Sequence, residues 1–309
     1  MTSPPQTITF PSSVHQIAAH LYHPPPSAPT RNNAAIIISH PMTGVKEQTS
    51  TTYATYLRNA GFITLTFDAA YQGESTGEPR GLEDPLQRVE DIKSAVTYLS
   101  TLTGVVDSTK IGVVGICASG GYASYATASD GRIRALATVS GACVGRMTRC
   151  GGVHEHLREN AEAISGALMV AAEGRRDEMA RGGSGMEAPR MFDAQNVADD
   201  ADPFFRAAAQ YYGTERGRHE RSTQRVPLSS YDRMVAYDSF NFQHLIAPRP
   251  LLMIAGSEAE TLHYSREAVR LAREPKELFV VPGKNHFDLY DTLDESGPKL
   301  VEFFGKYLA

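Results

Sequence analysis

The segment 110–123, KIGVVGICASGGYA, constrains the fold most, because it places one cysteine between a strand pattern and a helix pattern. Residues 111–114 form an apolar, β-branched run that is typical of a buried parallel strand, and residues 118–128 are small and compatible with a helix. The chain is therefore expected to turn sharply at Cys117. A side chain on such a turn lies beside the positive N-terminal end of the next helix, which favours a thiolate. Cys117 is the candidate nucleophile.

Strand and helix patterns alternate along most of the chain. Buried strands are predicted at 34–39, 62–67, 111–114, 133–140, 250–255 and 277–281. Helices are predicted at 50–60, 84–103, 118–128, 265–272 and 289–308. Two antiparallel strands, 7–10 and 15–22, are expected at the leading edge. This order predicts an α/β fold with a mostly parallel sheet and helices on both faces.

Residues 148–230 depart from this alternation. They are polar, rich in arginine and glutamate, mainly helical in pattern, and interrupted by a glycine-rich break at 181–185. An insertion that leaves from a strand end commonly covers the binding face of such a sheet. We therefore expect a helical cap at 148–230 and a core made of 1–147 and 231–309.

Composition excludes several classes of function. The 309 residues carry a net charge of -5 without a basic stripe, so no nucleic-acid partner is expected. The three cysteines form no C-x-x-C pair, so we expect no disulfide framework, no metal site and no cofactor. No signal peptide or membrane-spanning run is evident, which predicts a cytoplasmic protein without membrane contact. The oligomeric state stays open, with a homodimer among the alternatives.

A nucleophile of this kind needs a base and a group that orients the base. His286 follows the last predicted strand and precedes the closing helix, which makes it the candidate base. The loop after strand 250–255 contains Glu258 and Glu260, and Glu260 is the first choice for the orienting acid. Asp238, near the end of the cap, is a further alternative.

The remaining site candidates surround these positions. The N–H groups of Ala118 and Met42 are expected to form the oxyanion hole, because Pro41 has no N–H to donate. His40 and Tyr71 are candidate pocket residues, although ordinary packing explains each of them equally well.

Other nucleophiles fit the pattern less well. Ser119 is a rival nucleophile, but its side chain is expected to face the fold. Cys143 and Cys150 have no base pattern nearby and are interpreted as packing residues.

The segment Gly115-Ile116-Cys117-Ala118-Ser119 resembles the G-x-S-x-G nucleophile turn of α/β-hydrolases, with cysteine in place of the serine and Ser119 in place of the last glycine. Together with segments 40–48, 67–68, 73–75, 115–122 and 283–290, it makes the chain similar to the YcjY-like α/β-hydrolases, which include fungal polyketide transferases. Dienelactone hydrolase is similar in using a cysteine, a histidine and an acid. The resemblance implies the α/β-hydrolase fold and a catalytic triad.

A cysteine nucleophile attacks esters, lactones and thioesters, and exchange between two thioesters is nearly isoenergetic. The sequence therefore predicts a hydrolase or acyltransferase that forms an acyl-Cys117 intermediate. The expected substrate is an apolar, polyketide-type acyl compound, either free or bound to a carrier protein. One alternative is a cyclase in which His286 is the base for an aldol-type or Knoevenagel condensation. Another is a non-catalytic binding protein on the same scaffold.

Overall fold

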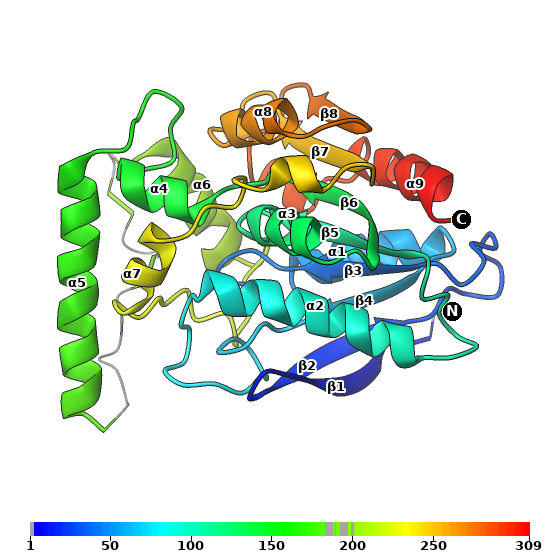
Figure 1. Cartoon of the computed structure of the whole chain (residues 1–309), viewed down its shortest axis with the longest axis horizontal. Helices are drawn as coiled ribbons and strands as arrows, with labels where there is room; N and C mark the ends of the chain where they lie inside the picture. Colours follow the sequence, from blue (N-terminus) through cyan, green and yellow to red (C-terminus); the bar gives the residue numbers. More distant parts are fainter. Residues whose placement is uncertain (1–2, 183–187, 189, 192–196, 199–200) are drawn as a thin grey trace.

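The computed structural model describes residues 3–182, 188, 190–191, 197–198 and 201–309. An eight-stranded sheet with the order β1-β2-β4-β3-β5-β6-β7-β8 crosses this described part of the chain (Figure 1). The strands β1 (Gln6–Ser12) and β2 (His15–Tyr22) are antiparallel to their neighbours. The parallel strands are β3 (Ala35–Ser39), β4 (Ile63–Phe67), β5 (Ile111–Ile116), β6 (Ile133–Val139), β7 (Leu251–Gly256) and β8 (Lys276–Val281). The predicted α/β fold is confirmed.

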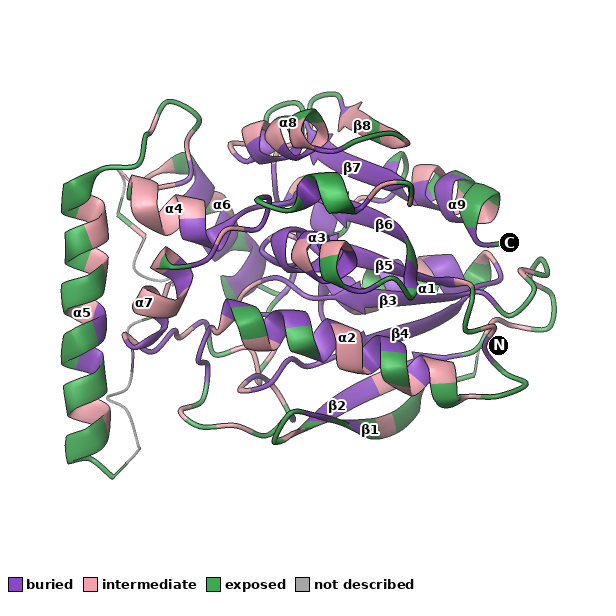
Figure 2. Ribbon diagram, viewed as in Figure 1, coloured by how far each residue is buried: buried purple, intermediate pink, exposed green. Residues whose placement is uncertain are grey.

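Helices cover both faces of the sheet. The covering helices are α1 (Thr49–Asn59), α2 (Pro85–Thr101), α3 (Ser119–Ser129), α8 (Leu262–Leu271) and α9 (Ser296–Tyr307). A Cβ added to Gly112 would meet Phe304 of α9, whereas a Cβ added to Gly115 would meet Ser119 of α3. These glycines therefore let helices approach β5 closely from opposite sides. Figure 2 shows the resulting core, in which β3, β4, β5 and β7 are wholly buried and β6 nearly so, while the edge strand β8 is partly exposed.

The C-terminal helix is shorter than predicted. The structure has a 3-10 turn, η2 (Asp288–Tyr290), and a separate helix α9 that begins at Ser296, where one helix was predicted over 289–308. Pro298 explains the break, because a proline cannot donate to the preceding turn and its ring clashes with the carbonyl four residues earlier. The proline is tolerated in the first turn of α9, because an N–H at that position would have no acceptor within the helix.

Helices also lie between β6 and β7 in the chain. They are α4 (Val144–Cys150), α5 (Ala161–Ala180), α6 (Pro203–Gly213) and α7 (Ser230–Val235), followed by the 3-10 turn η1 (Gln243–Leu245). Their exposed outer member, α5, forms one end of the molecule (Figures 1 and 2). Of the predicted glycine-rich break, 183–185 lie outside the described residues. We call 148–230 the cap segment.

No helix in the described ranges combines the length and apolarity needed to cross a membrane.

Candidate active site

Cys117 follows directly after β5 and has a backbone φ of +57°. This left-handed conformation is strained for a residue with a Cβ and is typical of functional positions. The turn is held by hydrogen bonds from the Cys117 N–H to the carbonyl of Val139 and from the N–H of Gly120 to the carbonyl of Cys117. Cys117 keeps part of its surface accessible while the neighbouring residues 111–116 and 118–120 are buried. The turn therefore presents one thiol at the carboxyl end of the sheet.

The thiol is uncharged in this environment. Burial raises the pKa of Cys117, and hydrogen bonds from the Tyr290 hydroxyl and the Ala118 N–H offset only part of the rise. The thiolate that we expected from the helix N-terminus is therefore disfavoured at neutral pH, because burial removes the water that would solvate its charge. Attack by this sulfur requires a base that removes its proton during the reaction.

His286 lies in the loop between β8 and η2 and is fully buried. Its carbonyl accepts a hydrogen bond of 2.9 Å from the Ser140 hydroxyl, which ties the loop to the end of β6. Its Nδ1 lies 2.6 Å from the Thr261 hydroxyl, and its Nε2 lies 3.1 Å from the Tyr290 hydroxyl. Burial lowers the pKa of His286 to about 3, so the imidazole is neutral at physiological pH.

The predicted acids do not reach His286. Glu258 is exposed and Glu260 is half-buried, and the hydrogen-bond partners of His286 among the described residues are the hydroxyls of Thr261 and Tyr290. Asp238 is paired with Arg146 at 2.8 Å and so is committed elsewhere. The structure instead places the hydroxyl of Thr261, the residue after Glu260, against Nδ1. Our sequence analysis missed it because it weighed only carboxylates.

Tyr290 is a second site residue that the sequence analysis missed. Its hydroxyl contacts the Cys117 thiol and His286 Nε2, and it also hydrogen-bonds the hydroxyl of Tyr212 on α6. Tyr290 follows His286 by four residues, a spacing that places two side chains on one face of a helical turn. That spacing is the signal that the sequence offers for Tyr290, which our prediction placed only in the closing helix 289–308.

The two candidate oxyanion donors lie at the ends of neighbouring strands. Ser39 at the end of β3 pairs with Gly115 in β5, which brings Met42 toward the turn at Cys117. Within the described residues, the N–H of Met42 has no hydrogen-bond acceptor. The N–H of Ala118 hydrogen-bonds the Cys117 sulfur. The Met42 N–H is thus free to bind an oxygen that forms beside this sulfur, and the Ala118 N–H would exchange its bond to the sulfur for one to that oxygen.

The loop that carries Met42 is fixed from two sides. The buried Lys46 ammonium lies 2.8 Å from the Asp68 carboxylate, which follows β4. The Thr43 hydroxyl donates to Gln224 Oε1 of the cap segment at 2.8 Å. The cap segment and the end of β4 therefore both hold the position of the Met42 N–H.

Three other candidates have structural partners. His40 is fully buried, with Nδ1 bonded to the Pro41 carbonyl at 2.7 Å and Nε2 accepting from the Ala69 N–H at 3.0 Å. Ser119 is fully buried, and its hydroxyl bonds the carbonyl of His40. The ring of Tyr71 packs against His15 at a centroid distance of 4.8 Å. The structure does not bring these side chains to the Cys117 thiol.

The three cysteines are free thiols. Cys143 is buried, and its sulfur accepts from the Ser239 N–H at 3.3 Å, while Cys150 ends α4. No group of three or more His, Cys, Asp or Glu that could hold a metal ion occurs among the residues that the structure describes.

An apolar cavity of about 450 Å³ adjoins Met42. Met147 of α4 and Met234 of α7 line it, and no charged side chain of the described residues does. One face of α5 supplies its outer wall through Ala163, Gly166, Ala167 and Val170. Helix α6, which is rich in aromatic residues, covers the candidate catalytic base, and its Phe204 ring lies 5.2 Å from the ring of His286. This cavity can hold an apolar group next to the candidate oxyanion donors.

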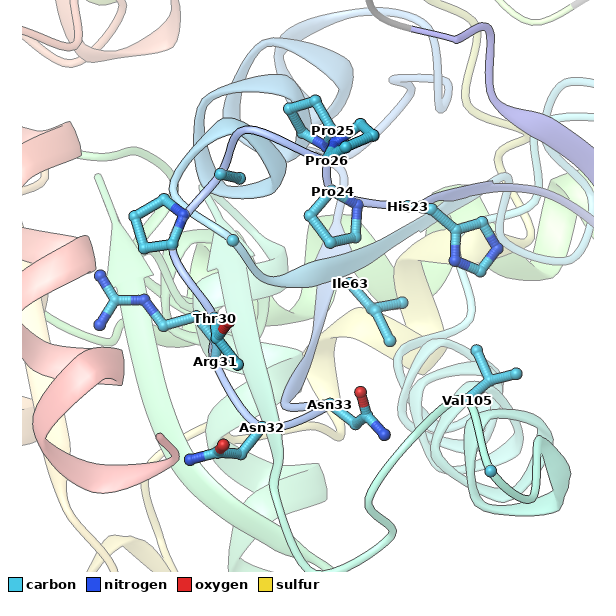
Figure 3. Close-up of a pocket in the computed structure, with 14 residues that line it drawn as sticks. His23, Pro24, Pro25, Pro26, Thr30, Arg31, Asn32, Asn33, Ile63 and Val105 are labelled. Carbon is cyan, nitrogen blue, oxygen red and sulfur yellow. The ribbon is translucent and has the colours of Figure 1, made fainter.

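A second cavity, of about 470 Å³, lies at the other end of the sheet (Figure 3). It is lined by the prolines 24–26 and by Asn33, Ile63 and Val105, which lie before or at the start of β3, β4 and β5. Ligands of parallel sheets bind beyond the carboxyl ends of the strands, where Cys117 lies. Of these two cavities, the one lined by Met42 lies toward the end of the sheet that carries Cys117.

The parallel sheet, the strained turn after β5 and the histidine after β8 are the features that define an α/β hydrolase. The chain belongs to the alpha/beta hydrolase family, which it matches over residues 48–296.

The relatives agree with this assignment. The chain is 37% identical over 276 residues to the uncharacterized protein YcjY of Escherichia coli strain K12, covering 89% of this chain and 88% of YcjY. The crystal structure of the hypothetical protein PA2218 from Pseudomonas aeruginosa matches with a TM-score of 0.90 and 32% identity, covering 98% of this chain and 94% of that one. A thiohydrolase of Eupenicillium brefeldianum is 26% identical over 271 residues, 84% of this chain and 81% of the relative. The expected similarity to the YcjY-like group with fungal members is confirmed.

Proposed function

We propose that this α/β hydrolase transfers or hydrolyses an apolar acyl group through a thioester on Cys117. The observation that carries the proposal is the placement of a strained thiol and a neutral imidazole against the same Tyr290 hydroxyl. Met42, one of the two candidate oxyanion donors, lines an apolar cavity. The similarity to a fungal thiohydrolase supports a thioester as the substrate.

In the first step the Cys117 sulfur attacks the acyl carbonyl carbon, and His286 receives the thiol proton. The carbonyl electron pair moves to the oxygen, which the N–H groups of Met42 and Ala118 stabilise. The bond to the leaving thiol then breaks, and that thiol takes the proton back from His286. A water, alcohol or amine attacks the acyl-Cys117 in the second step.

The acyl chain occupies the cavity beside Met42 in this proposal. The cavity suits an uncharged chain because a buried charge without a partner is costly. The cap segment, with α6 over His286, limits the access of water and so favours transfer to a bound acceptor over hydrolysis. Polyketide-type acyl chains fit this chemistry.

A panel of N-acetylcysteamine thioesters with acyl chains from acetyl to dodecanoyl tests the function. Release of the free thiol is expected with the wild type and is expected to disappear in Cys117→Ala and His286→Ala. If Cys117→Ala retains turnover of a carbonyl substrate that His286→Ala loses, the protein is a condensation catalyst with His286 as the base. If no thioester is consumed, the proposal is wrong.

A further inference from the structure

The candidate base does not hydrogen-bond the candidate nucleophile. Among the described residues, His286 Nε2 has the Tyr290 hydroxyl as its partner at 3.1 Å, and the Cys117 sulfur also contacts this hydroxyl. The phenol therefore lies between the thiol and the imidazole, where a cysteine hydrolase would be expected to have direct contact.

Each proton shared by the Cys117 thiol, the Tyr290 hydroxyl and the His286 imidazole can be assigned to a donor and an acceptor. A neutral imidazole carries one N–H, and when Nδ1 donates to the Thr261 hydroxyl, Nε2 is an acceptor. The Tyr290 hydroxyl then donates its single proton to Nε2, and its oxygen is left to accept the proton of the neutral Cys117 thiol that it contacts. A proton can therefore pass in one direction, from the sulfur through the phenol to the base.

We propose that Tyr290 is a catalytic residue that carries the proton between Cys117 and His286, an inference that rests on the function proposed above. As the sulfur bonds to the acyl carbon, the thiol proton moves to the Tyr290 oxygen, and the Tyr290 proton moves to His286 Nε2. When the carbon–sulfur bond to the leaving group breaks, His286 returns its proton to the Tyr290 oxygen, and the phenol proton passes to the leaving sulfur. No net proton is gained or lost, and Tyr290 is a neutral phenol before and after each step.

The surroundings fit this role. Tyr290 is fully buried, and burial raises its pKa well above the ordinary value, so the hydroxyl persists at every physiological pH. Its backbone carbonyl accepts from the Thr49 hydroxyl at 2.8 Å. This hydrogen bond helps to hold the phenol between its two partners.

Tyr212 is a positioning residue in this arrangement. It belongs to α6 of the cap segment, and its hydroxyl bonds the Tyr290 hydroxyl. The cap therefore helps to orient the proton carrier in addition to covering the base.

The experiment compares Tyr290→Phe, which keeps the ring and removes the hydroxyl, with Tyr211→Phe as the matched control from the same aromatic cluster. Acylation of Cys117 by an octanoyl thioester is measured in a stopped-flow instrument. We expect Tyr290→Phe to slow acylation roughly 100-fold or more, because proton transfer by a positioned group contributes at least that much, while Tyr211→Phe stays within about threefold of the wild type. Unfolding temperatures within a few degrees of the wild type exclude misfolding as the cause.

A second measurement needs no substrate. The rate at which iodoacetamide alkylates Cys117, located by peptide mass spectrometry, is followed against pH. Once the thiol has ionised, the Tyr290 hydroxyl can turn its proton toward the thiolate and stabilise it, which lowers the pKa of Cys117. The alkylation profile of Tyr290→Phe is therefore expected to move to higher pH, while that of Tyr211→Phe does not move.

The outcomes separate the two proposals. A wild type that is never acylated, combined with the expected shift in alkylation, overturns the acyl-transfer function and keeps the contact of Tyr290 with the thiol. Acylation of Tyr290→Phe at nearly the wild-type rate overturns the role of Tyr290 and leaves the function intact. Tyr212→Phe should lower the rate by about tenfold or less, because one neutral hydrogen bond is lost.

Discussion

The hydroxyl of Thr261 lies 2.6 Å from Nδ1 of His286, so an uncharged side chain orients the candidate base. In the usual triad a carboxylate holds this position and stabilises the imidazolium that forms. Here none of the described residues supplies a carboxylate to offset the burial that lowers the pKa of His286 to about 3. The resting site therefore contains a neutral Cys117 thiol and a neutral His286 imidazole. The Thr261 hydroxyl stabilises a His286 imidazolium less than a carboxylate would.

This arrangement predicts which substitutions near His286 matter. Thr261→Val should lower kcat by about tenfold, because it removes one buried hydrogen bond to the imidazole, whereas Thr261→Ser should keep most of the activity. Glu258→Gln and Glu260→Gln should each stay within about twofold of the wild type. Steady-state kinetics with one thioester measure all four variants. A loss of a hundredfold or more in Glu260→Gln would show that the acid predicted from the sequence completes the triad after all.

Burial of His286 also predicts a dependence of stability on pH. Its pKa is about 3 in the folded state against 6.5 as the ordinary value, so below pH 6.5 the unfolded chain binds a proton that the folded protein does not. Stability from this group is complete above pH 6.5 and decreases as the pH falls toward 3, by about 3 kcal/mol at pH 4.

His286→Gln isolates this contribution. The hydrogen bonds lost in the variant change stability equally at each pH, so the quantity to compare is the difference in unfolding free energy between pH 7 and pH 4. Urea unfolding should give a difference about 3 kcal/mol smaller for His286→Gln than for the wild type. Equal differences in the two proteins would mean that His286 titrates normally in the folded state.

The α5 face of the cavity predicts a determinant of acyl-chain length. Ala167 lines the cavity, while its neighbour Leu168 is 45% exposed and does not. Ala167→Phe should fill part of the space and lower kcat/KM for a dodecanoyl thioester at least tenfold, with acetyl transfer changed less than about threefold. Leu168→Phe is the matched control and should leave the ratio of the two substrates unchanged. An equal loss for both chain lengths in Ala167→Phe would place the acyl chain elsewhere.

A buried ion pair joins the two segments that carry the oxyanion donors. The Arg88 guanidinium donates to the carbonyl of His40 at 2.6 Å and to the Ser119 hydroxyl at 3.0 Å, and it lies 3.6 Å from the Glu83 carboxylate. Arg88→Met should cost about 3 kcal/mol or more, because it leaves Glu83 buried without its cation. The double variant with Glu83→Gln should recover part of that loss in urea unfolding. A double variant no more stable than Arg88→Met would show that the carbonyl contacts, and not the ion pair, dominate.

Local sequence patterns predicted much of the fold because the strands are apolar runs ended by recognisable turns. The helix predicted over 84–103 occurs as α2, with Asp84 accepting hydrogen bonds from the N–H groups of Leu86 and Gln87 as its N-cap. The positions of Cys117 after β5 and His286 after β8 also followed from this order. The break before α9 was missed because the effect of Pro298 was not weighed against the apolar periodicity around it.

The site was predicted less completely because its contacts join residues that are distant in the chain. Thr261 and Tyr290 belong to common residue types whose role depends on which ring nitrogen of His286 each one meets. The protonation state of the Cys117 thiol could not be predicted from the sequence for a related reason. A helix N-terminus can be inferred from sequence, but the burial that raises the pKa of Cys117 depends on the packing of α6 and η2.

The central claim is that an acyl group bonds covalently to Cys117, and trapping that species tests it most directly. The wild type is mixed with a short excess of octanoyl thioester, quenched in acid within one turnover, and measured by intact-protein mass spectrometry, with peptide mapping of the adduct. The account predicts an octanoyl adduct on Cys117 that forms and decays at rates matching kcat and that is absent from Cys117→Ala, which no longer turns over. Full turnover by Cys117→Ala, or turnover by the wild type with no adduct on Cys117, would contradict it.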